Sequence, residues 1–259
     1  MRPVSLGALS ALEGSDLAEE VPPAVLTLLA QRGFDCPEKA RAFLHPKLRD
    51  LTCPFEMPDM RAAVERIFAA ADEGEEVVLY GDYDVDGVTS LTLLTQALRA
   101  YGLDPKPFLP HRIDEGYGVT REGLERCLLE FDPDLLIAVD CGTGSLDEIA
   151  DLRARGIDVI VLDHHEPSPN GRPDVIALVN PKAADSDYQY LCSAGVAFKL
   201  AHALVKARPN DGLDLKKFLD IAAVGTVADI VPLVEENRIL VRHGFAPPAG
   251  DRKPGRSAR

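Results

Sequence analysis

The sequence predicts an α/β fold: a parallel sheet with helices on both faces, preceded by a small helical N-terminal region. Two observations carry this prediction. Short, uninterrupted apolar segments at residues 77–80, 135–139 and 159–162 alternate with longer segments of helical periodicity. Strands that are apolar on both faces are typical of a parallel sheet buried between two layers of helices.

The expected elements follow one another in chain order. Residues 1–60 show helical spacing of apolar residues punctuated by prolines, which predicts the helical N-terminal region. Residues 61–71 predict an amphipathic helix that ends before Gly74. Strands are expected at 77–80, 106–109, 135–139, 159–162 and 175–179, and helices at 89–101, 120–130, 146–155, 195–207 and 215–227. We therefore expect one α/β domain over residues 61–244.

Composition sets the broad class of the protein. The chain has 259 residues, of which 46% are hydrophobic and 27% charged, as in ordinary globular proteins. No apolar run reaches the roughly 20 residues that cross a bilayer, and the N-terminus has no signal-peptide pattern, so we expect a cytoplasmic protein without a membrane partner. Residues 245–259 are rich in Pro, Gly and Arg without apolar periodicity, which predicts a disordered tail.

Charge and cysteine content narrow the function. The net charge of −14 argues against a passive nucleic-acid binder but not against an enzyme whose acids hold cations. The five cysteines include no CxxC pair, which favours reduced thiols over a disulfide scaffold or a zinc site.

Three acidic motifs each follow a predicted strand: GDYDVDG at 81–87, DCG at 140–142 and DHH at 163–165. In a parallel sheet, the loops at the carboxyl ends of the strands line one crevice. Carboxylates gathered so closely repel one another unless cations lie between them. Any one of these motifs alone is more often a solvated turn, but the combination predicts a metal site.

The residue types indicate which metal. Carboxylates with some imidazole suit Mn²⁺, Mg²⁺ or Zn²⁺; the lack of thiolates disfavours zinc, and imidazole favours Mn²⁺ over Mg²⁺. A calcium loop is disfavoured because the twelfth residue from Asp82 is Leu93 instead of glutamate. Gly87 and Gly142 are expected to let the backbone turn tightly beside the site and to leave room for a substrate.

At these motifs the sequence resembles the DHH phosphoesterase superfamily and, within it, the RecJ family of exonucleases that degrade single-stranded DNA from the 5′ end. The resemblance runs over roughly residues 28–244. Its motifs are GDYDVDGVTS at 81–90, DEGYGV at 114–119, VDCGTGS at 139–145, LDHHEP at 162–167, SAGVAFKL at 193–200 and AAVGTVADIVPL at 222–233. The resemblance implies that residues 61–244 are a DHH catalytic domain.

The resemblance also implies roles for matching residues. Asp84 would bind one of two divalent ions and Asp86 the other, while Asp140 would bridge both. His164 would complete the coordination of the second ion, and Asp229 would supply a further carboxylate.

Two residues keep alternative interpretations. Asp82 is a ligand or supports one. His165 orients a ligand or contacts phosphate, and a structural histidine is the alternative.

Candidate substrate contacts lie outside the acidic motifs. His111 and Arg112 stand between the first two metal-bearing strands, where Arg112 would pair with a phosphate or remain an ordinary surface arginine. Ser193 and Gly195 open a predicted helix whose free N–H groups could bind phosphate, with simple helix capping by Ser193 as the alternative.

The implied function is hydrolysis of phosphodiester bonds in single-stranded DNA from the 5′ end, in recombination and repair. Two divalent ions, Mn²⁺ or alternatively Mg²⁺, would activate a water molecule for in-line attack. Single-stranded DNA is the expected partner, and the family alone implies helicases or single-strand-binding proteins. Two alternatives remain: a DHH phosphodiesterase of short oligonucleotides or cyclic dinucleotides, and a non-catalytic replication scaffold.

The sequence departs from the RecJ pattern near its C-terminus. RecJ-like chains continue along a connecting helix into a DHH-associated domain and an oligonucleotide-binding fold, whereas FAPPAGDRKPGRSAR follows Gly244 here. We therefore expect a C-terminally truncated chain in which the metal site is intact and the grip on the strand is weakened.

Overall fold

The computed structural model describes residues 5–183 and 188–246. The described chain divides after Leu51 into two compact units, which are taken separately below. Most of the expected disordered tail, from residue 247 onward, lies outside the described residues.

The first unit is helical, as the sequence predicts. Apolar side chains from successive helices, among them Leu12, Leu17 and Leu26, are almost fully buried in a small core of its own. Its elements are α1 (Leu6–Glu13), α2 (Leu17–Glu20), α3 (Pro23–Gln31), α4 (Pro37–Leu44) and the 3₁₀ turn η1 (Leu48–Asp50).

The second unit is built on a five-stranded, entirely parallel sheet, which confirms the predicted fold class. Its strands are β1 (Val77–Gly81), β2 (Lys106–Phe108), β3 (Leu135–Val139), β4 (Asp158–Leu162) and β5 (Ala177–Val179). Their order in space is β2-β1-β3-β4-β5, so the chain leaves β1 for one edge and returns to its other side. The switch point between β1 and β3 is where open α/β sheets generally bind ligands.

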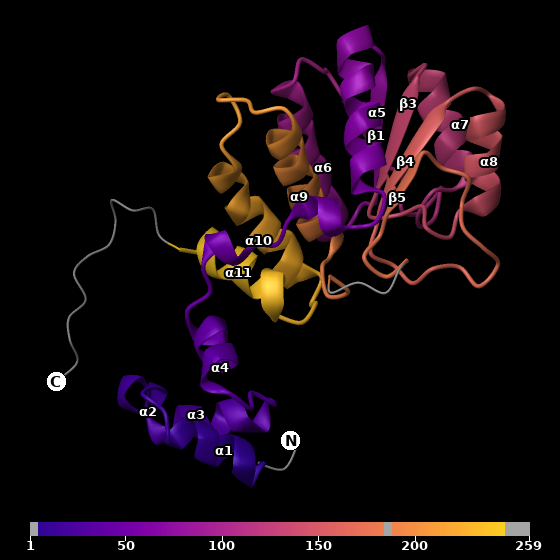
Figure 1. The fold of residues 1–259 in the computed structure, drawn as a ribbon. Coiled ribbons are helices and arrows are strands. Elements are labelled where there is room, and N and C mark those ends of the chain that lie inside the picture. The colour runs from indigo at the N-terminus through magenta and orange to yellow at the C-terminus, as the bar shows by residue number, and fades with distance from the viewer. Residues whose placement is uncertain (1–4, 184–187, 247–259) are drawn as a thin grey trace. The chain divides into compact units, whose positions relative to one another are not determined.

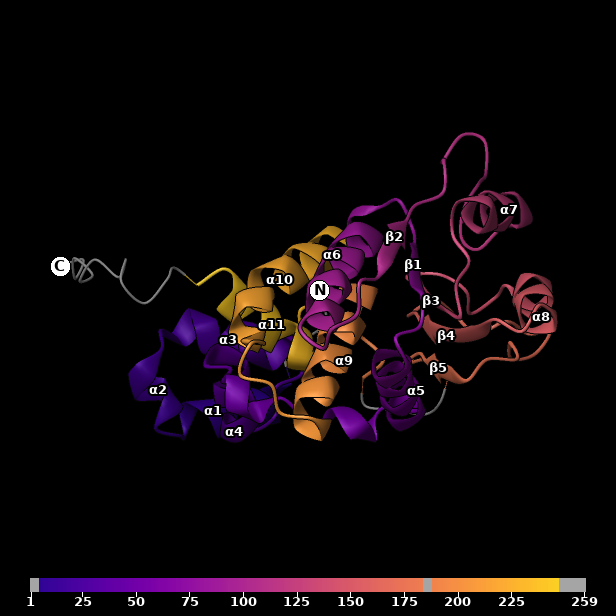
Figure 2. The ribbon, with the colours of Figure 1, turned by 90° about the horizontal axis from the view of Figure 1, so that it is seen from above.

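Helices cover both faces of the sheet (Figures 1 and 2). The helices α7 (Arg121–Glu130) and α8 (Leu146–Ala154) pack on one face through a shared apolar core. On the other face lie α5 (Met60–Glu73), α6 (Val85–Arg99) and α9 (Ser193–Ala207), and α10 (Leu219–Ala228) packs against α6 and α9. The remaining elements are α11 (Glu235–Gly244), which packs on α10, and the 3₁₀ turns η2 (Pro54–Glu56) and η3 (Leu215–Phe218).

Two helix boundaries differ from the prediction. The helix expected from residue 89 begins at Val85, because Asp84 caps it by accepting a hydrogen bond of 3.0 Å from the backbone N–H of Gly87. The single helix expected at 215–227 is instead a 3₁₀ turn followed by α10. The first metal motif is therefore half loop and half helix.

The two motif glycines serve different purposes. Gly142 has a φ of 104°, which fits the predicted tight turn after β3. Gly87 lies within α6, where a Cβ would collide with the backbone carbonyl of Asp82. The expectation of a turn and of substrate space at Gly87 is therefore wrong: this glycine permits the close approach of two backbone segments.

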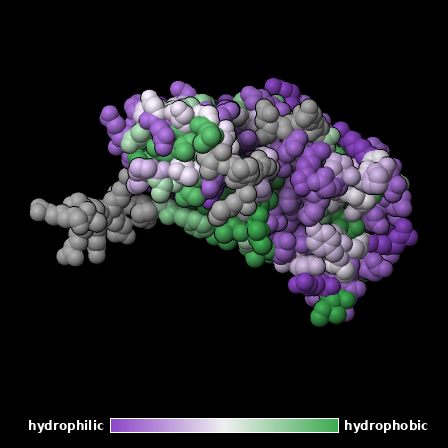
Figure 3. All heavy atoms as spheres, turned by 90° about the horizontal axis from the view of Figure 1, so that it is seen from below, coloured by the Kyte–Doolittle hydropathy of each residue, from purple (hydrophilic) through white to green (hydrophobic). Residues whose placement is uncertain are grey.

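None of the helices in the described part of the chain combines the length and apolar character needed to span a bilayer. On the face shown in Figure 3, hydrophilic side chains cover much of the surface and hydrophobic ones gather in limited patches.

Candidate metal centre

The sheet register places three aspartates at equivalent positions beyond neighbouring strands. The backbone N–H of Asp82 donates to the carbonyl of Val139, that of Asp140 to Leu162, and that of Asp163 to Val179, at 3.2, 2.9 and 3.2 Å. Each aspartate thus continues the hydrogen-bonding pattern of its strand by one residue. The three acidic motifs therefore meet at the carboxyl edge of the sheet, as the sequence predicts.

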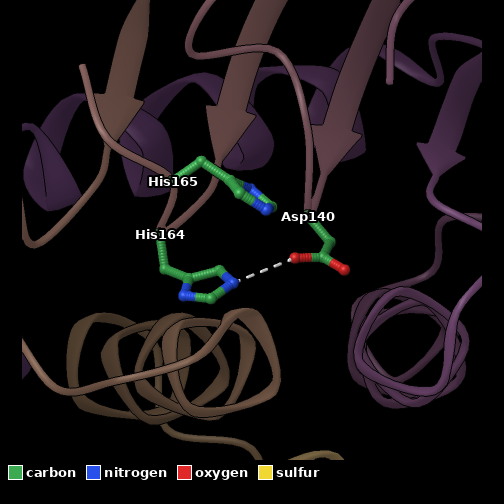
Figure 4. Close-up of side chains that lie close together, drawn as sticks. All are labelled: Asp140, His164 and His165. Carbon is green, nitrogen blue, oxygen red and sulfur yellow. Dashed lines mark ion pairs between the residues drawn. The ribbon is translucent and has the colours of Figure 1, made fainter. Parts of the chain in front are cut away.

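The predicted ligands form a continuous cluster around Asp140 and His164. The Nε2 atom of His164 lies 3.4 Å from Asp140 Oδ1 (Figure 4). The same atom is 3.7 Å from both Asp86 Oδ2 and Asp229 Oδ2. Three groups have ligand atoms that lie within 4.8 Å of one another: Asp82 with Asp84 and Asp140; Asp86 with His164 and Asp229; and Asp140 with His164 and His165. The first two groups share no residue, which leaves room for two ions.

The carboxylates at the centre of the cluster are buried without enough donors. Asp82 is 0% exposed, and neither of its carboxylate oxygens has a hydrogen-bond partner among the described residues; the same holds for Oδ1 of Asp140. Burial, together with the nearby Asp84, raises the pKa of Asp82. Burial and the charges of Asp86 and Asp84 raise the pKa of Asp140 to about 10. Unpaired buried carboxylates need a cation, and this donor set of oxygen and imidazole fits Mn²⁺ or Mg²⁺.

Asp86 is held in place by the N-terminus of α9. Its Oδ2 accepts a hydrogen bond of 2.7 Å from the backbone N–H of Ser193, and its Oδ1 accepts one of 2.9 Å from Ala194. Burial still raises the pKa of Asp86, although these bonds oppose the shift. The helix begins after Cys192, so Ser193 is not its cap. Substrate binding by Ser193 and Gly195 remains a prediction that these contacts do not support, because the N–H of Ser193 already serves Asp86.

Asp163 differs from its neighbours because it is well supplied with donors. It accepts hydrogen bonds from His165 Nδ1 at 2.7 Å, from the N–H of His164 at 2.7 Å and from the N–H of Thr143 at 3.0 Å. Burial would raise the pKa of Asp163, but the hydrogen bonds from His165 and Thr143 outweigh burial and hold it below its ordinary value. Asp163 therefore orients the two histidines instead of facing an ion.

His165 connects this aspartate to an exposed aromatic residue. Its Nε2 lies 2.7 Å from the hydroxyl of Tyr117, while its Nδ1 contacts Asp163. The hydrogen bond with Asp163 raises the pKa of His165 to about 9. Of the interpretations offered by the sequence, this geometry favours an orienting role. Sequence reasoning missed Tyr117, although it lies in the DEGYGV motif.

Asp229 reaches the cluster from the end of α10. The residue is the C-cap of that helix, and its side chain is 20% exposed. Burial is also the main cause that raises the pKa of Asp229. No strand precedes Asp229, so neither the periodicity nor the strand-end rule could have identified it.

The predicted substrate contacts at 111–112 lie on an exposed segment. The guanidinium of Arg112 stacks over the ring of Tyr83, 5.0 Å from its centroid, and Tyr83 lies between Asp82 and Asp84 in the first motif. This places Arg112 beside the cluster. The backbone N–H of His111 donates to Glu115 Oε2 at 2.7 Å, and substrate binding by the His111 side chain stays a prediction.

A family model described as the DHH family, N-terminal domain, matches residues 76–226. The chain belongs to the DHH family. Among its relatives is the single-stranded-DNA-specific exonuclease RecJ of Bacillus subtilis, 42% identical over 227 residues, which are 87% of this chain and 28% of that protein. RecJ of Thermus thermophilus is 37% identical over 81% of this chain and 32% of its own length.

Solved structures of DHH family members agree with the fold. RecJ from Thermus thermophilus in complex with Mn²⁺ matches with a TM-score of 0.75 and 32% identity, over 94% of this chain and 34% of that one. An exonuclease RecJ bound to manganese matches with a TM-score of 0.67 and 37% identity, over 76% of this chain and 49% of that one. The chain thus spans less than half the length of the relatives and structures it resembles.

Proposed function

We propose that this chain carries the hydrolytic centre of a metal-dependent exonuclease that removes nucleotides from the 5′ end of single-stranded DNA, in recombination and repair. The observation that carries the proposal is the set of buried, unpartnered carboxylate oxygens on Asp82 and Asp140, which lie within reach of His164. The names of the RecJ relatives, which are single-stranded-DNA-specific exonucleases, support the choice of substrate.

Two divalent cations would divide the ligands between them. Asp82, Asp84 and Asp140 would hold one ion, while Asp86, His164 and Asp229 would hold the other, with Asp140 close to both groups. Mn²⁺ is the preferred ion and Mg²⁺ the alternative, as imidazole ligation and the manganese-bound relatives suggest. When bound, such ions lower the pKa of water and neutralise the charge of a phosphodiester.

The surrounding residues prepare the site for this chemistry. The N–H groups at the start of α9 fix Asp86 in one orientation, and Asp163 fixes His165, so the ligands require little rearrangement when substrate arrives. Arg112, stacked on Tyr83, would pair with a strand phosphate at the rim. Neither a serine nor a cysteine nucleophile is needed in this account.

The test is digestion of defined substrates by the full chain with Mn²⁺. A linear single strand should release mononucleotides from its 5′ end, whereas a circular single strand and a blunt duplex should resist. Asp140→Ala should be inactive, and Asp151→Ala, which removes an aspartate that is 57% exposed on α8, should behave as wild type. Cleavage of the circle would contradict the exonuclease assignment.

The alternatives give different results in the same assay. A phosphodiesterase of short oligonucleotides or cyclic dinucleotides would hydrolyse dinucleotides and leave long strands intact. A replication scaffold would bind no metal, and the cluster of predicted ligands described above argues against it. Cytoplasmic location and an association with helicases or single-strand-binding proteins belong to the proposal and await co-purification experiments.

A further inference from the structure

A groove opens beside the metal centre, and His164 belongs to both. The hollow has a volume of about 430 Å³, which is within the range of small-ligand sites. Its lining includes His164, Glu166, Lys182, Tyr190, Val231 and Pro232. The imidazole of His164 that faces this groove is the one whose Nε2 lies 3.4 Å from Asp140.

One buried side chain joins two of the segments that line the groove. Asn237, on α11, is 1% exposed, and its Nδ2 donates to the backbone carbonyl of Tyr190 at 2.5 Å and to that of Pro232 at 3.1 Å. These two carbonyls belong to segments separated by about forty residues of sequence. The groove is therefore a built feature whose width is set before any ligand enters.

The backbone directly before Val231 and Pro232 is strained. Ile230 has a φ of 61°, a conformation that β-branched residues rarely adopt, and its side chain is 88% exposed. Such strain persists only where the surrounding structure enforces it, often at functional sites. Here the bend allows Asp229 to approach His164 while Val231 and Pro232 line the groove.

The chemistry of the lining fits a nucleotide. Tyr190 is 46% exposed, which leaves its ring available for stacking, and Val231 and Pro232 add apolar surface to the same groove. Lys182 contributes an ammonium group, now 3.1 Å from Glu166, whose side chain is 81% exposed. Because an ion pair with so exposed a partner is weak, a phosphate can compete for Lys182.

We propose that this groove holds one nucleotide of the DNA strand, next to the phosphodiester that is cut. The base stacks on Tyr190 against Val231 and Pro232, and the phosphate of that nucleotide pairs with Lys182. This inference rests on the proposed nuclease function and specifies where the strand leaves the metal centre.

The kinetic test compares Tyr190→Ala with Tyr190→Phe on a single-stranded oligonucleotide. Stacking on an aromatic side chain contributes enough that Tyr190→Ala should raise KM by about 5- to 140-fold with little change in kcat, whereas Tyr190→Phe keeps the ring and should match wild type. Leu129→Ala, which removes an apolar side chain that is 89% exposed on α7, is the matched surface control. An oligonucleotide with an abasic residue at the position that occupies the groove has no base to stack there, so the KM of Tyr190→Ala on that substrate should equal that of wild type.

A binding test separates the groove from the nuclease activity. Oligonucleotides carrying 2-aminopurine at successive positions are titrated with the full chain in Ca²⁺ and, separately, in chelator; the chain has no tryptophan to interfere. One position near the 5′ end should be quenched by wild type and Tyr190→Phe but not by Tyr190→Ala. Lys182→Met should weaken binding without removing the quenching.

The outcomes are distinct. If wild type cuts no phosphodiester yet quenches at one position through Tyr190, the proposed function fails and the groove stands as a nucleotide site. If Tyr190→Ala matches wild type in both KM and quenching, the groove proposal is overturned while the nuclease assignment remains. A rise in KM that is equally large on the abasic oligonucleotide would also overturn it, because Tyr190 would then act on something other than the base.

Discussion

Two buried acidic regions of the second unit differ in the source of the positive charge that balances their carboxylates. At the metal centre, Asp82 and Asp140 present carboxylate oxygens that meet no donor among the described residues. Elsewhere in this unit, one oxygen of Glu236 accepts hydrogen bonds from Lys199 Nζ at 3.0 Å and from the N–H and hydroxyl of Thr52 at 2.7 and 2.5 Å. Lys199 is 0% exposed, and burial lowers its pKa despite the neighbouring Glu236.

The comparison shows that the chain supplies an ammonium group to the buried Glu236, whose Oε2 still meets no donor among the described residues, whereas Asp82 meets neither a donor nor a cationic side chain there. Both arrangements depend on α9: its N-terminus holds Asp86, and Lys199, further along it, ties α11 and the start of the second unit to the same helix. We therefore expect a cation from solution to bind at the sheet edge, where Asp82 and Asp140 lie.

The largest expected effect is that of removing Asp140, which belongs to one proposed ligand group and lies 3.4 Å from His164 of the other. Asp140→Ala should abolish cleavage of single-stranded DNA and release most of the bound metal, because Asp140 lies beside both proposed ion sites. Steady-state digestion and metal analysis check this, with Asp151→Ala as the control. Normal turnover of Asp140→Ala at saturating Mn²⁺ would contradict the assignment.

Removing the ammonium group of the buried Lys199 should destabilise the fold instead. Lys199→Met leaves Glu236 buried without its ammonium partner, so the free energy of unfolding should fall by about 3–5 kcal/mol. Chemical denaturation measures this loss. The double variant Lys199→Met with Glu236→Gln should recover part of it, since no charge is left unpaired. A loss below about 1 kcal/mol in Lys199→Met would show that the Lys199–Glu236 pair contributes little to the stability of the fold.

Adding Mn²⁺ from solution should stabilise the protein. With free Mn²⁺ at 100 times its dissociation constant, linkage predicts about 2.7 kcal/mol of stabilisation, which is a rise in Tm of roughly 5–10 °C for a domain of this size. Chelator should reverse the shift, and Asp140→Ala should lack it. A Tm that is the same with Mn²⁺ and with chelator would argue against a preformed site.

The smallest expected effect belongs to Asp163, which orients ligands without needing an ion. Asp163→Asn should weaken Mn²⁺ affinity by roughly 10- to 100-fold, as is typical of residues that support metal ligands, and should leave the number of bound ions unchanged. Isothermal titration calorimetry separates the affinity from the stoichiometry. Loss of an entire ion in Asp163→Asn would show that Asp163 binds an ion directly and would contradict the orienting role inferred from its hydrogen bonds.

The sequence was sufficient for the parts of this molecule that depend on local pattern. The buried strands are apolar along their length, so β1, β3 and β4 could be predicted, and with them the meeting of the three acidic motifs. Contacts between distant residues could not be predicted. The hydrogen bond from Ser193 to Asp86 and the one from Asn237 to the carbonyl of Tyr190 each join segments that lie far apart in the sequence. No local pattern of residues predicts such contacts.

Roles within a motif were also hidden from the sequence. Asp140 and Asp163 occupy equivalent positions after neighbouring strands, yet one lacks donors and the other has several. The difference arises from the side chain of His165 and the backbone of Thr143, which only the folded chain brings to Asp163. Asp229 entered the prediction through family resemblance alone, because it ends a helix and follows no strand.

The central claim is that bare carboxylates at the sheet edge bind divalent cations. Its most direct test is to count Mn²⁺ ions bound to the full chain by electron paramagnetic resonance, in which free Mn²⁺ gives a sharp signal that diminishes on binding. We predict two ions per chain in wild type, with signs of spin coupling between them, and the loss of most binding in Asp140→Ala but not in Asp151→Ala. A wild-type chain that leaves all Mn²⁺ free, or an Asp140→Ala variant that binds both ions, would contradict the claim.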